Sequence, residues 1–146
     1  MTIRIQKLRD TAALPAYQSE MAAGADLYAA LDEPLTLVPM GRALVPTGIA
    51  AQPDRDDCVL LIAARSGLAV KKGVTLSNGI GVVDADYRGE ICVGLVNLGP
   101  DTVTIAPGER IAQLLIMPIL RAEFTEADSL DSTDRGAGGF GHTGTK

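Results

Sequence analysis

RIAQLLIMPIL, residues 110–120, is the stretch that decides the fold class. In an extended chain the side chains alternate between two faces, so the odd-numbered residues 111–117 share one face and the even-numbered residues 112–116 share the other. Gln113 is the one polar side chain among them, and both faces are mostly apolar. A strand that is apolar on both sides lies inside a sandwich or against another subunit. The stretch therefore predicts a strand that is covered on both sides. If another subunit provides the cover, the protein is an oligomer.

Other short apolar runs alternate with turn signals along the whole chain. The turn signals are PMG at 39–41, PDRDD at 53–57, NG at 78–79, NLGPD at 97–101 and PG at 107–108. This alternation is typical of an all-β sandwich or barrel. SGLAVK at 66–71 has room for one or two turns of helix, and no long helix is expected. The expected strands are Ile3–Lys7, Ala25–Leu31, Arg42–Gln52, Cys58–Arg65, Glu90–Leu98, Thr102–Ala106 and Arg110–Ile119.

Composition limits both the core and the partners. The 146 residues suit one domain, and a hydrophobic content of 47% excludes a disordered chain. Aromatic residues make up only 3%, so the core must consist mainly of Val, Ile, Leu and Ala. The formal charge is -5 and no run of Lys and Arg is present, which argues against a nucleic acid partner. A small anion stays open, because a few arginines or a divalent cation can bind it locally.

The N-terminal MTIRIQKLRD lacks the apolar stretch of a signal peptide, and no segment is long and apolar enough to span a membrane. We therefore expect a cytoplasmic protein without a membrane partner. Cys58 and Cys92 each lie inside an apolar run, which favours two buried thiols over a disulfide. His142 is the only histidine, so a structural zinc site has too few ligands.

The C-terminal RGAGGFGHTG, residues 135–144, has five glycines in ten residues together with an arginine and a phenylalanine. Glycine amides can approach phosphate oxygens closely, and Arg135 can bind phosphate with its planar guanidinium. Phe140 can stack on a flat ring. The alternative is a solvated terminus, because chains rich in glycine order only at a high entropic cost. GK[ST] is missing, so the segment is not a Walker A loop.

GVVDADYRGEI, residues 81–91, contains a candidate general base. If the segment is extended, Asp84 and Asp86 share one face, and Tyr87 and Arg88 lie near a bend before Gly89. An ionised aspartate beside a water molecule can take its proton, and a nearby tyrosine can form a platform for a substrate. The alternative is an exposed hairpin turn whose charges are solvated.

ARSGLA, residues 64–69, follows the apolar run CVLLIA. Arg65, Ser66 and Gly67 at the end of a strand can offer an anion a guanidinium, a hydroxyl and free amides. The alternative is a strand exit with a capping serine.

Two further segments give weaker signals. AGADLYAA, residues 23–30, places Asp26 among small residues, where a turn before a strand is the favoured interpretation. GERIAQLLI, residues 108–116, places Gln113 in an apolar run, where its amide needs a partner unless it faces water at a sheet edge.

Taken together and in this order, the five segments resemble the five motifs of the trimeric dUTP diphosphatases (dUTPases). The resemblance runs from residue 23 to residue 144 and so covers nearly the whole chain. It implies a jelly-roll-like β-clip or sandwich over residues 1–130, a homotrimer with active sites at the subunit boundaries, and a tail over 131–146 that closes a neighbour's site. It also implies Mg²⁺-dependent hydrolysis of dUTP to dUMP and pyrophosphate, which limits uracil in DNA and supplies dUMP for dTMP synthesis.

The resemblance assigns a role to each matching residue of the nucleoside end. Asp84 resembles the aspartate that deprotonates the water attacking the α-phosphorus. Tyr87 resembles the tyrosine under the deoxyribose that leaves no room for a 2′-hydroxyl, and Asn78 matches a position that helps to read uracil. Asn78 is followed by Gly79, where the family often has a proline.

The resemblance also assigns roles to the residues that would contact the phosphate end of the nucleotide. Arg65, Ser66 and Gly67 resemble the phosphate-binding second motif, and Gln113 resembles the glutamine near the α-phosphate and a metal-bound water. The resemblance places Mg²⁺ on substrate phosphates and waters without a direct protein ligand, supported indirectly by Gln113 and Asp26.

The tail completes the resemblance. Arg135 resembles the arginine that reaches the γ-phosphate, Phe140 the aromatic lid on uracil, and Gly141 belongs to the same nucleotide-binding motif. His142 stands where serine is frequent in the family.

Two alternatives remain. A dCTP deaminase shares the family fold and an arginine-serine motif, but it releases ammonia and does not need the DADYRGE segment. A nucleotide-binding regulator on the same fold would bind without turnover, and the joint presence of Asp84, Gln113, Arg135 and Phe140 argues against it.

Overall fold

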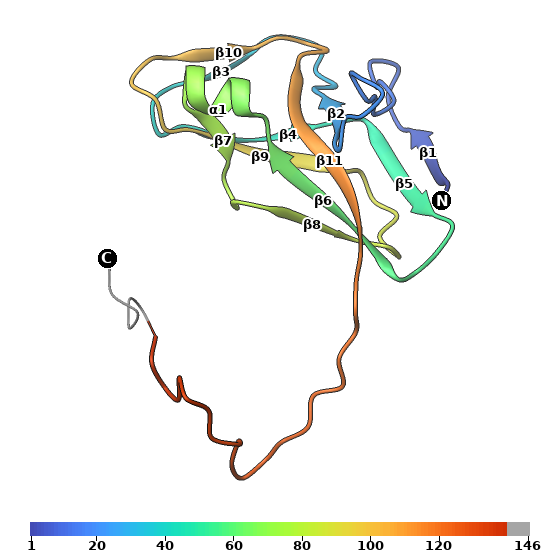
Figure 1. Cartoon of the computed structure of the whole chain (residues 1–146). Helices are drawn as coiled ribbons and strands as arrows, with labels where there is room; N and C mark the ends of the chain where they lie inside the picture. The colour runs from blue at the N-terminus through green and yellow to red at the C-terminus, as the bar shows by residue number, and fades with distance from the viewer. Residues whose placement is uncertain (140–146) are drawn as a thin grey trace.

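The computed structural model describes residues 1–139, so Phe140, Gly141 and His142 lie outside the described residues. The described chain is built almost entirely from short strands and has a single helix, α1 (Ser66–Lys72), which confirms the all-β class (Figure 1). The strands are β1 (Ile3–Lys7), β2 (Ala25–Tyr28), β3 (Leu35–Leu37), β4 (Arg42–Pro46), β5 (Ile49–Pro53), β6 (Cys58–Ala64), β7 (Val74–Leu76), β8 (Gly81–Asp84), β9 (Cys92–Asn97), β10 (Val103–Ile105) and β11 (Arg110–Pro118).

The strands form four small antiparallel sheets. The largest has the order β2-β11-β6-β8, a second has the order β4-β9-β7, and the pairs β1-β5 and β10-β3 complete the fold. β11, the strand that decided the fold class, is hydrogen-bonded to β2 on one side and to β6 on the other. Its first half is buried on both faces, while Met117 near its end is 45% exposed. The predicted two-sided coverage therefore holds over the first half of the strand.

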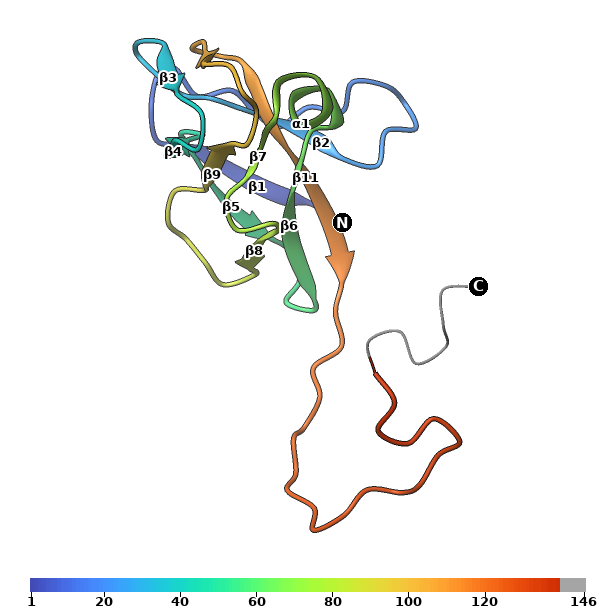
Figure 2. The same cartoon turned by 90° about the vertical axis from the view of Figure 1, so that its left-hand side faces the viewer.

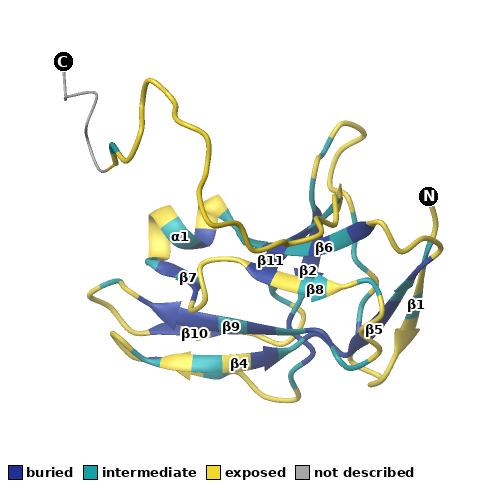
Figure 3. Cartoon of the chain, turned by 90° about the horizontal axis from the view of Figure 1, so that it is seen from below, coloured by how far each residue is buried: buried dark blue, intermediate teal, exposed yellow. Residues whose placement is uncertain are grey.

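The core is aliphatic, as the composition predicts. Within the described residues, the buried cluster consists of Leu, Ile, Val and Ala side chains from nearly every strand together with Leu68 of α1. Figure 3 shows this buried layer running along β9 and β11. A core without aromatic rings needs many short elements, because each small side chain contributes little buried area.

The expected strand Arg42–Gln52 is two strands, which corrects the prediction. β4 pairs with β9 and β5 pairs with β1, so the chain passes from one sheet to another at Thr47 and Gly48. Gly48 has a φ of 69°, and a Cβ there would lie 2.6 Å from the Cβ of Ala12. Apolar patterning could not show the break, because the residues on both sides of it are buried.

Three short strands were missing from the sequence prediction, namely β3, β7 and β8. The NG turn at 78–79 follows β7 and precedes β8, but these strands belong to different sheets, because β7 pairs with β9 and β8 pairs with β6. The turn around Asn78 therefore connects two sheets.

After Pro118 the chain leaves the body. Residues 119–139, which we call the arm, form no helix or strand and extend away from the sheets in both views (Figures 1 and 2). Cys58 and Cys92 are free, as predicted, and Cys58 is buried, but Cys92 is only partly buried, which corrects the prediction of two buried thiols. In the described part of the chain, no helix has the length and apolar character needed to cross a membrane.

Candidate active site

Among the charged residues that the structure describes, Asp26 is the most deeply buried, with an exposed fraction of 1%. It lies in β2, so the interpretation of a turn before a strand is wrong. Its Oδ1 accepts a hydrogen bond from Nε of Arg65 at 3.1 Å, and its Oδ2 accepts one from a guanidinium nitrogen of Arg110 at 3.1 Å. A buried carboxylate needs such partners, because an unpaired charge in the interior is costly.

Sequence reasoning missed Arg110, although a signal was present. Arg110 begins β11, and the register places it opposite Tyr28 at the far end of β2. A buried aspartate requires a cation, and Arg110 lies next to the motif that contains Gln113. Its backbone carbonyl also accepts a hydrogen bond from Arg65 at 3.0 Å, so the two arginines are connected to one another.

Gln113 lies beside this cluster. β11 is a central strand, so the alternative of a sheet edge facing water is wrong. Gln113 is the cross-strand partner of Asp26, which places both side chains on one face of the sheet. Gly24 makes room for it, because a Cβ on Gly24 would lie 3.2 Å from the Cβ of Gln113. We call Asp26, Arg65, Arg110 and Gln113 the acid-arginine cluster.

Ser66 and Gly67 form the first turn of α1, directly after Arg65. Both are exposed, and Ser66 makes no side-chain cap of the helix, so the capping alternative is wrong. The first helical hydrogen bond runs from Ala69 N–H to the carbonyl of Arg65. The amides before Ala69 therefore have no partner within the helix and can donate to a ligand.

Asp84 is the last residue of β8 and is exposed. The chain turns immediately after it, because Tyr87 N–H donates to the carbonyl of Asp84 at 3.1 Å. Asp86 therefore does not continue an extended strand and does not share a face with Asp84 in the way that the sequence suggested. We call residues 84–90 the Asp84 loop. Its tyrosine is 46% exposed and its hydroxyl donates to the carbonyl of Glu90 at 3.1 Å.

Asp84 lies at the border of two hollows on the surface. One, of about 320 Å³, is lined by Val82, Asp84, Tyr87 and Cys92 among others. The other, of about 490 Å³, contains Asp84 and Asp86 together with residues at the start of the arm. An exposed carboxylate at the edge of a partly apolar hollow can contact a bound organic molecule and water at the same time.

Asn78 lies at the other end of β8. It is exposed, and Val82 and Asp84 follow it on the outward face of the strand. Gly79 adopts a φ of 74°, and no atom lies within 4 Å of where its Cβ would be. Asn78 therefore lies in an open turn just before β8, and Val82 and Asp84 lie on the outward face of that strand, which is the edge strand of the four-stranded sheet.

One chain does not bring all predicted residues together. Asp84 is opposite Val59 in the pairing of β8 with β6, whereas Arg65 follows the other end of β6. Six residues of strand, at ~3.3 Å each, separate the two positions by about 20 Å. The Asp84 loop and the acid-arginine cluster are thus two separate groups on the same chain.

The tail residues give a third group. Arg135 is exposed, and its Nε donates to the carbonyl of Gly138 at 2.8 Å. It lies on the arm, apart from the body (Figure 1). The predictions for Phe140 and Gly141 concern residues outside the described part.

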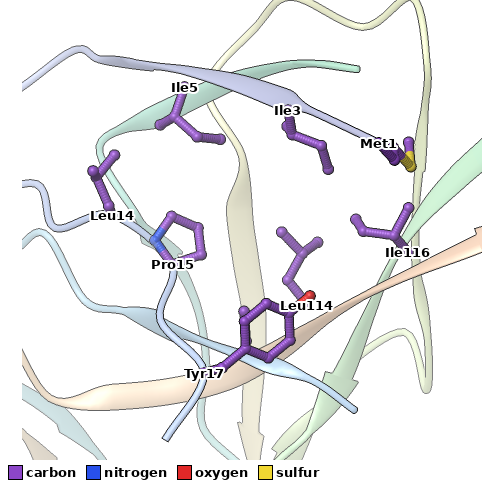
Figure 4. Close-up of a pocket in the computed structure, with 9 residues that line it drawn as sticks. Met1, Ile3, Ile5, Leu14, Pro15, Tyr17, Leu114 and Ile116 are labelled. Atoms are coloured by element: carbon purple, nitrogen blue, oxygen red, sulfur yellow. The ribbon is translucent and has the colours of Figure 1, made fainter. Parts of the chain in front are cut away.

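An apolar hollow of about 490 Å³ lies elsewhere, between β1 and β11, and holds none of the predicted site residues (Figure 4). Metal ligands do not gather in it or anywhere else in residues 1–139, where no three His, Cys, Asp or Glu side chains could hold an ion together.

Comparison with known proteins assigns the family. The family model described as dUTPase matches residues 10–144. The chain is 52% identical over 136 residues to a deoxyuridine 5′-triphosphate nucleotidohydrolase of Desulfotalea psychrophila, covering 92% of this chain and 89% of the relative. It is 48% identical to the enzyme of the same name from Syntrophotalea carbinolica, covering 99% and 97%.

A solved structure agrees with the sequence relatives. The dUTPase of Staphylococcus bacteriophage 80alpha with dUPNHPP has a TM-score of 0.87 and 27% identity, and the match covers 98% of both chains. The chain belongs to the dUTPase family.

Proposed function

We propose that the protein hydrolyses dUTP to dUMP and pyrophosphate, as a homotrimer whose active sites are shared between chains. The observation that carries this proposal is the position of Asp84, an exposed carboxylate at the end of β8 whose backbone carbonyl is bonded to the amide of Tyr87. This hydrogen bond holds the proposed base, Asp84, and the proposed platform for the sugar, Tyr87, at the two ends of one turn of the chain. Relatives that are about half identical carry the name of this activity.

The outward face of β8 supports binding of the nucleoside. Asn78, in the turn before β8, would read the uracil edge together with backbone groups of its loop. The ring of Tyr87 would lie under the deoxyribose and exclude a 2′-hydroxyl. The hollow beside Tyr87 has exposed apolar surface from Val82, which suits a flat base.

The acid-arginine cluster and the start of α1 support binding of the triphosphate. Ser66 and Gly67 would donate from exposed amides and a hydroxyl, and Arg65 would contribute its guanidinium. Asp26 keeps Arg65 in place and offsets its charge. Gln113, which shares a sheet face with Asp26, would bind near the α-phosphate.

Mg²⁺ fits this arrangement without a protein cage. Mg²⁺ typically keeps several waters and is bound through one or two carboxylates and substrate phosphates. The carboxylate of Asp26 already has two guanidinium partners, which leaves it an indirect role beside Gln113. When bound, the ion neutralises charge on the phosphates.

The chemical step then follows from the groups of the chain. Asp84 accepts a proton from water, the water oxygen forms a bond to the α-phosphorus, and the bond from that phosphorus to the bridging oxygen of the β-phosphate breaks. Pyrophosphate leaves with the bond electrons, and dUMP remains. A positioned base of this kind contributes roughly 10²–10⁴ to the rate.

The separation of about 20 Å between Asp84 and Arg65 along β6 supports sharing of the site between chains. In the proposed function both residues act at the phosphates of one nucleotide, so they would come from different copies. The arm supports association, because its side chains Leu120, Phe124 and Leu130 are at least 90% exposed in the single chain. Three large apolar side chains exposed on one segment offer a partner chain apolar surface to cover.

The tail, residues 131–146, would close the site. Arg135 would reach the γ-phosphate, and Phe140 and Gly141 would cover the base. Ordering about ten residues costs on the order of ten kcal/mol at most, so closure needs the triphosphate, the ring and the amides together. The two free thiols are consistent with a cytoplasmic location. There the reaction would limit uracil in DNA and supply dUMP for dTMP synthesis.

The experiment that tests the function is measurement of pyrophosphate and ammonia release with Mg²⁺, offering dUTP, dCTP, dTTP and UTP in parallel. Pyrophosphate from dUTP alone supports the proposal together with its base and sugar selectivity. Ammonia from dCTP would make the protein a deaminase, and dUTP binding without turnover would make it a regulator.

A further inference from the structure

Glu90, the last residue of the Asp84 loop, connects that loop to two distant segments. Its carboxylate accepts two hydrogen bonds from Arg9, at 3.0 and 3.3 Å. Oε1 also accepts a hydrogen bond at 2.9 Å from the amide of Gly48, at the crossing from β4 to β5. Gly48 is buried, so its amide has no access to bulk water and depends on this carboxylate. The side chain of Glu90 thus ties the end of the Asp84 loop to two segments of the body, while the pairing of β8 with β6 fixes its start.

The backbone of Glu90 holds the tyrosine. The hydroxyl of Tyr87 donates to the carbonyl of Glu90 at 3.1 Å, while the amide of Tyr87 donates to the carbonyl of Asp84 at 3.1 Å. Tyr87 therefore bridges the two ends of the loop. The position of its ring depends on where the backbone of Glu90 is fixed.

Gly89 makes this arrangement sterically feasible. A Cβ on Gly89 would lie 2.3 Å from the hydroxyl oxygen of Tyr87 and 2.5 Å from the adjoining ring carbon. The ring is thus packed directly over the glycine backbone. It cannot shift toward the loop, and the bond to Glu90 keeps it from swinging outward.

We propose that Glu90 is a positioning residue for sugar selection: its carboxylate, held by Arg9 and the Gly48 amide, sets the height of the Tyr87 ring and thereby the exclusion of a 2′-hydroxyl. The inference rests on the proposed function, in which Tyr87 lies under the deoxyribose. In the proposed function, sugar selection depends on the position of the Tyr87 ring, whereas turnover depends on Asp84, which is fixed by β8. Loosening Glu90 should therefore affect the rejection of UTP more than the turnover of dUTP.

The test compares kcat/KM for dUTP with kcat/KM for UTP. We expect Glu90→Ala to lower this ratio by roughly three- to tenfold, chiefly through better use of UTP, because the Gly48 amide and Arg9 both lose their acceptor. Glu90→Gln keeps an acceptor for the amide and should recover most of the ratio. Glu109→Ala is the matched control, because Glu109 also pairs with a cation, Lys72, and accepts a backbone amide, that of Ala106. The ratio should not change in this control.

Testing Glu90→Ala also in a Tyr87→Ala protein distinguishes an effect on the position of the tyrosine ring from a general loosening of the structure. In Tyr87→Ala protein the ring is absent, so adding Glu90→Ala should produce no further loss of the ratio. An equal loss in both backgrounds, or an unchanged ratio in Glu90→Ala itself, would overturn the proposal.

Hydrogen exchange gives a readout that is independent of activity. In the free protein, Glu90→Ala should speed exchange in peptides covering residues 47–49 and 84–91, and Glu109→Ala should not. If the wild type fails to hydrolyse dUTP, the proposed function fails, and with it the link to sugar selection. Unchanged exchange in an active Glu90→Ala enzyme would refute the tie between Glu90 and the loop alone.

Discussion

Asp84 and Arg65 lie at opposite ends of β6: Asp84 is paired with Val59 near the start of the strand, and Arg65 follows its last residue. The distance, about 20 Å along the strand, is too long for one nucleotide phosphate to contact both residues of the same chain. Under the proposed function, in which both residues act on one nucleotide, two copies of the chain would supply them. This relationship connects the fold of one chain with the proposed assembly.

Asp84→Asn should abolish most turnover while leaving binding intact. Asparagine has nearly the same shape but cannot accept a proton, so we expect kcat for dUTP to fall by about 10²–10⁴. Titration calorimetry should show dUTP binding close to that of the wild type. Asp86→Asn is the control, because Asp86 is an exposed neighbour in the turn. Near-normal kcat in Asp84→Asn would remove this residue from the role of general base.

A chain that ends at residue 134 should fold normally but turn over dUTP poorly. The cut lies within the arm, where residues 120–134 form no helix or strand and are exposed, so the folded body stays whole up to the cut. We expect an unchanged thermal midpoint and a marked fall in kcat/KM, because Arg135 and Phe140 are lost together. Unchanged kinetics would mean that the tail is a solvated terminus.

Asp26→Asn should destabilise the protein and weaken dUTP binding together. The substitution leaves the guanidinium groups of Arg65 and Arg110 without a counter-charge, which we expect to lower the free energy of unfolding by about 1–3 kcal/mol. Urea unfolding measures the first effect and calorimetry the second. Asp101→Asn, at an exposed position, provides the comparison. Full stability in Asp26→Asn would show that the buried carboxylate is not needed to hold the arginines.

The sequence predicted the fold class and most strands, because aliphatic alternation and turn residues are local signals. It failed where the signal was not local. The break at Gly48 depends on contact with Ala12, and β8 is too short for its pattern to stand out.

The sequence likewise indicated those residues of the candidate site that lie in one local segment, but not the contacts between distant segments. Asp84 and Tyr87 belong to a recognisable segment, whereas the pairing of Asp26 with Arg110 spans 84 residues. The same limit applies to Glu90, whose partners Arg9 and Gly48 lie far from it in sequence.

The two thiols should react slowly in the native protein. Burial raises the pKa of the Cys58 thiol and that of Cys92, so both stay protonated at neutral pH. Because their pKa is higher in the folded state, the protonated thiols contribute to the free energy of unfolding. This contribution is complete below the unfolded pKa of about 8.5 and is lost as the pH rises through the native pKa.

Thiol reactivity can be followed with Ellman's reagent, using Cys92→Ala to isolate Cys58. We expect slow release of the chromophore at pH 7.5, a faster reaction at higher pH, and immediate reaction in denaturant. Rapid modification of native Cys58 at pH 7.5 would contradict the burial of this thiol.

The most direct measurement for the shared site is activity after mixing two inactive variants. Asp84→Asn and Gln113→Ala chains are unfolded together in equal amounts, refolded, and assayed for pyrophosphate release from dUTP. If Asp84 and Gln113 act from different chains, random assembly makes about a quarter of the sites wild type at both positions, so about a quarter of wild-type activity should return. Activity no higher than that of the separate variants would place both residues in one chain and contradict the shared site.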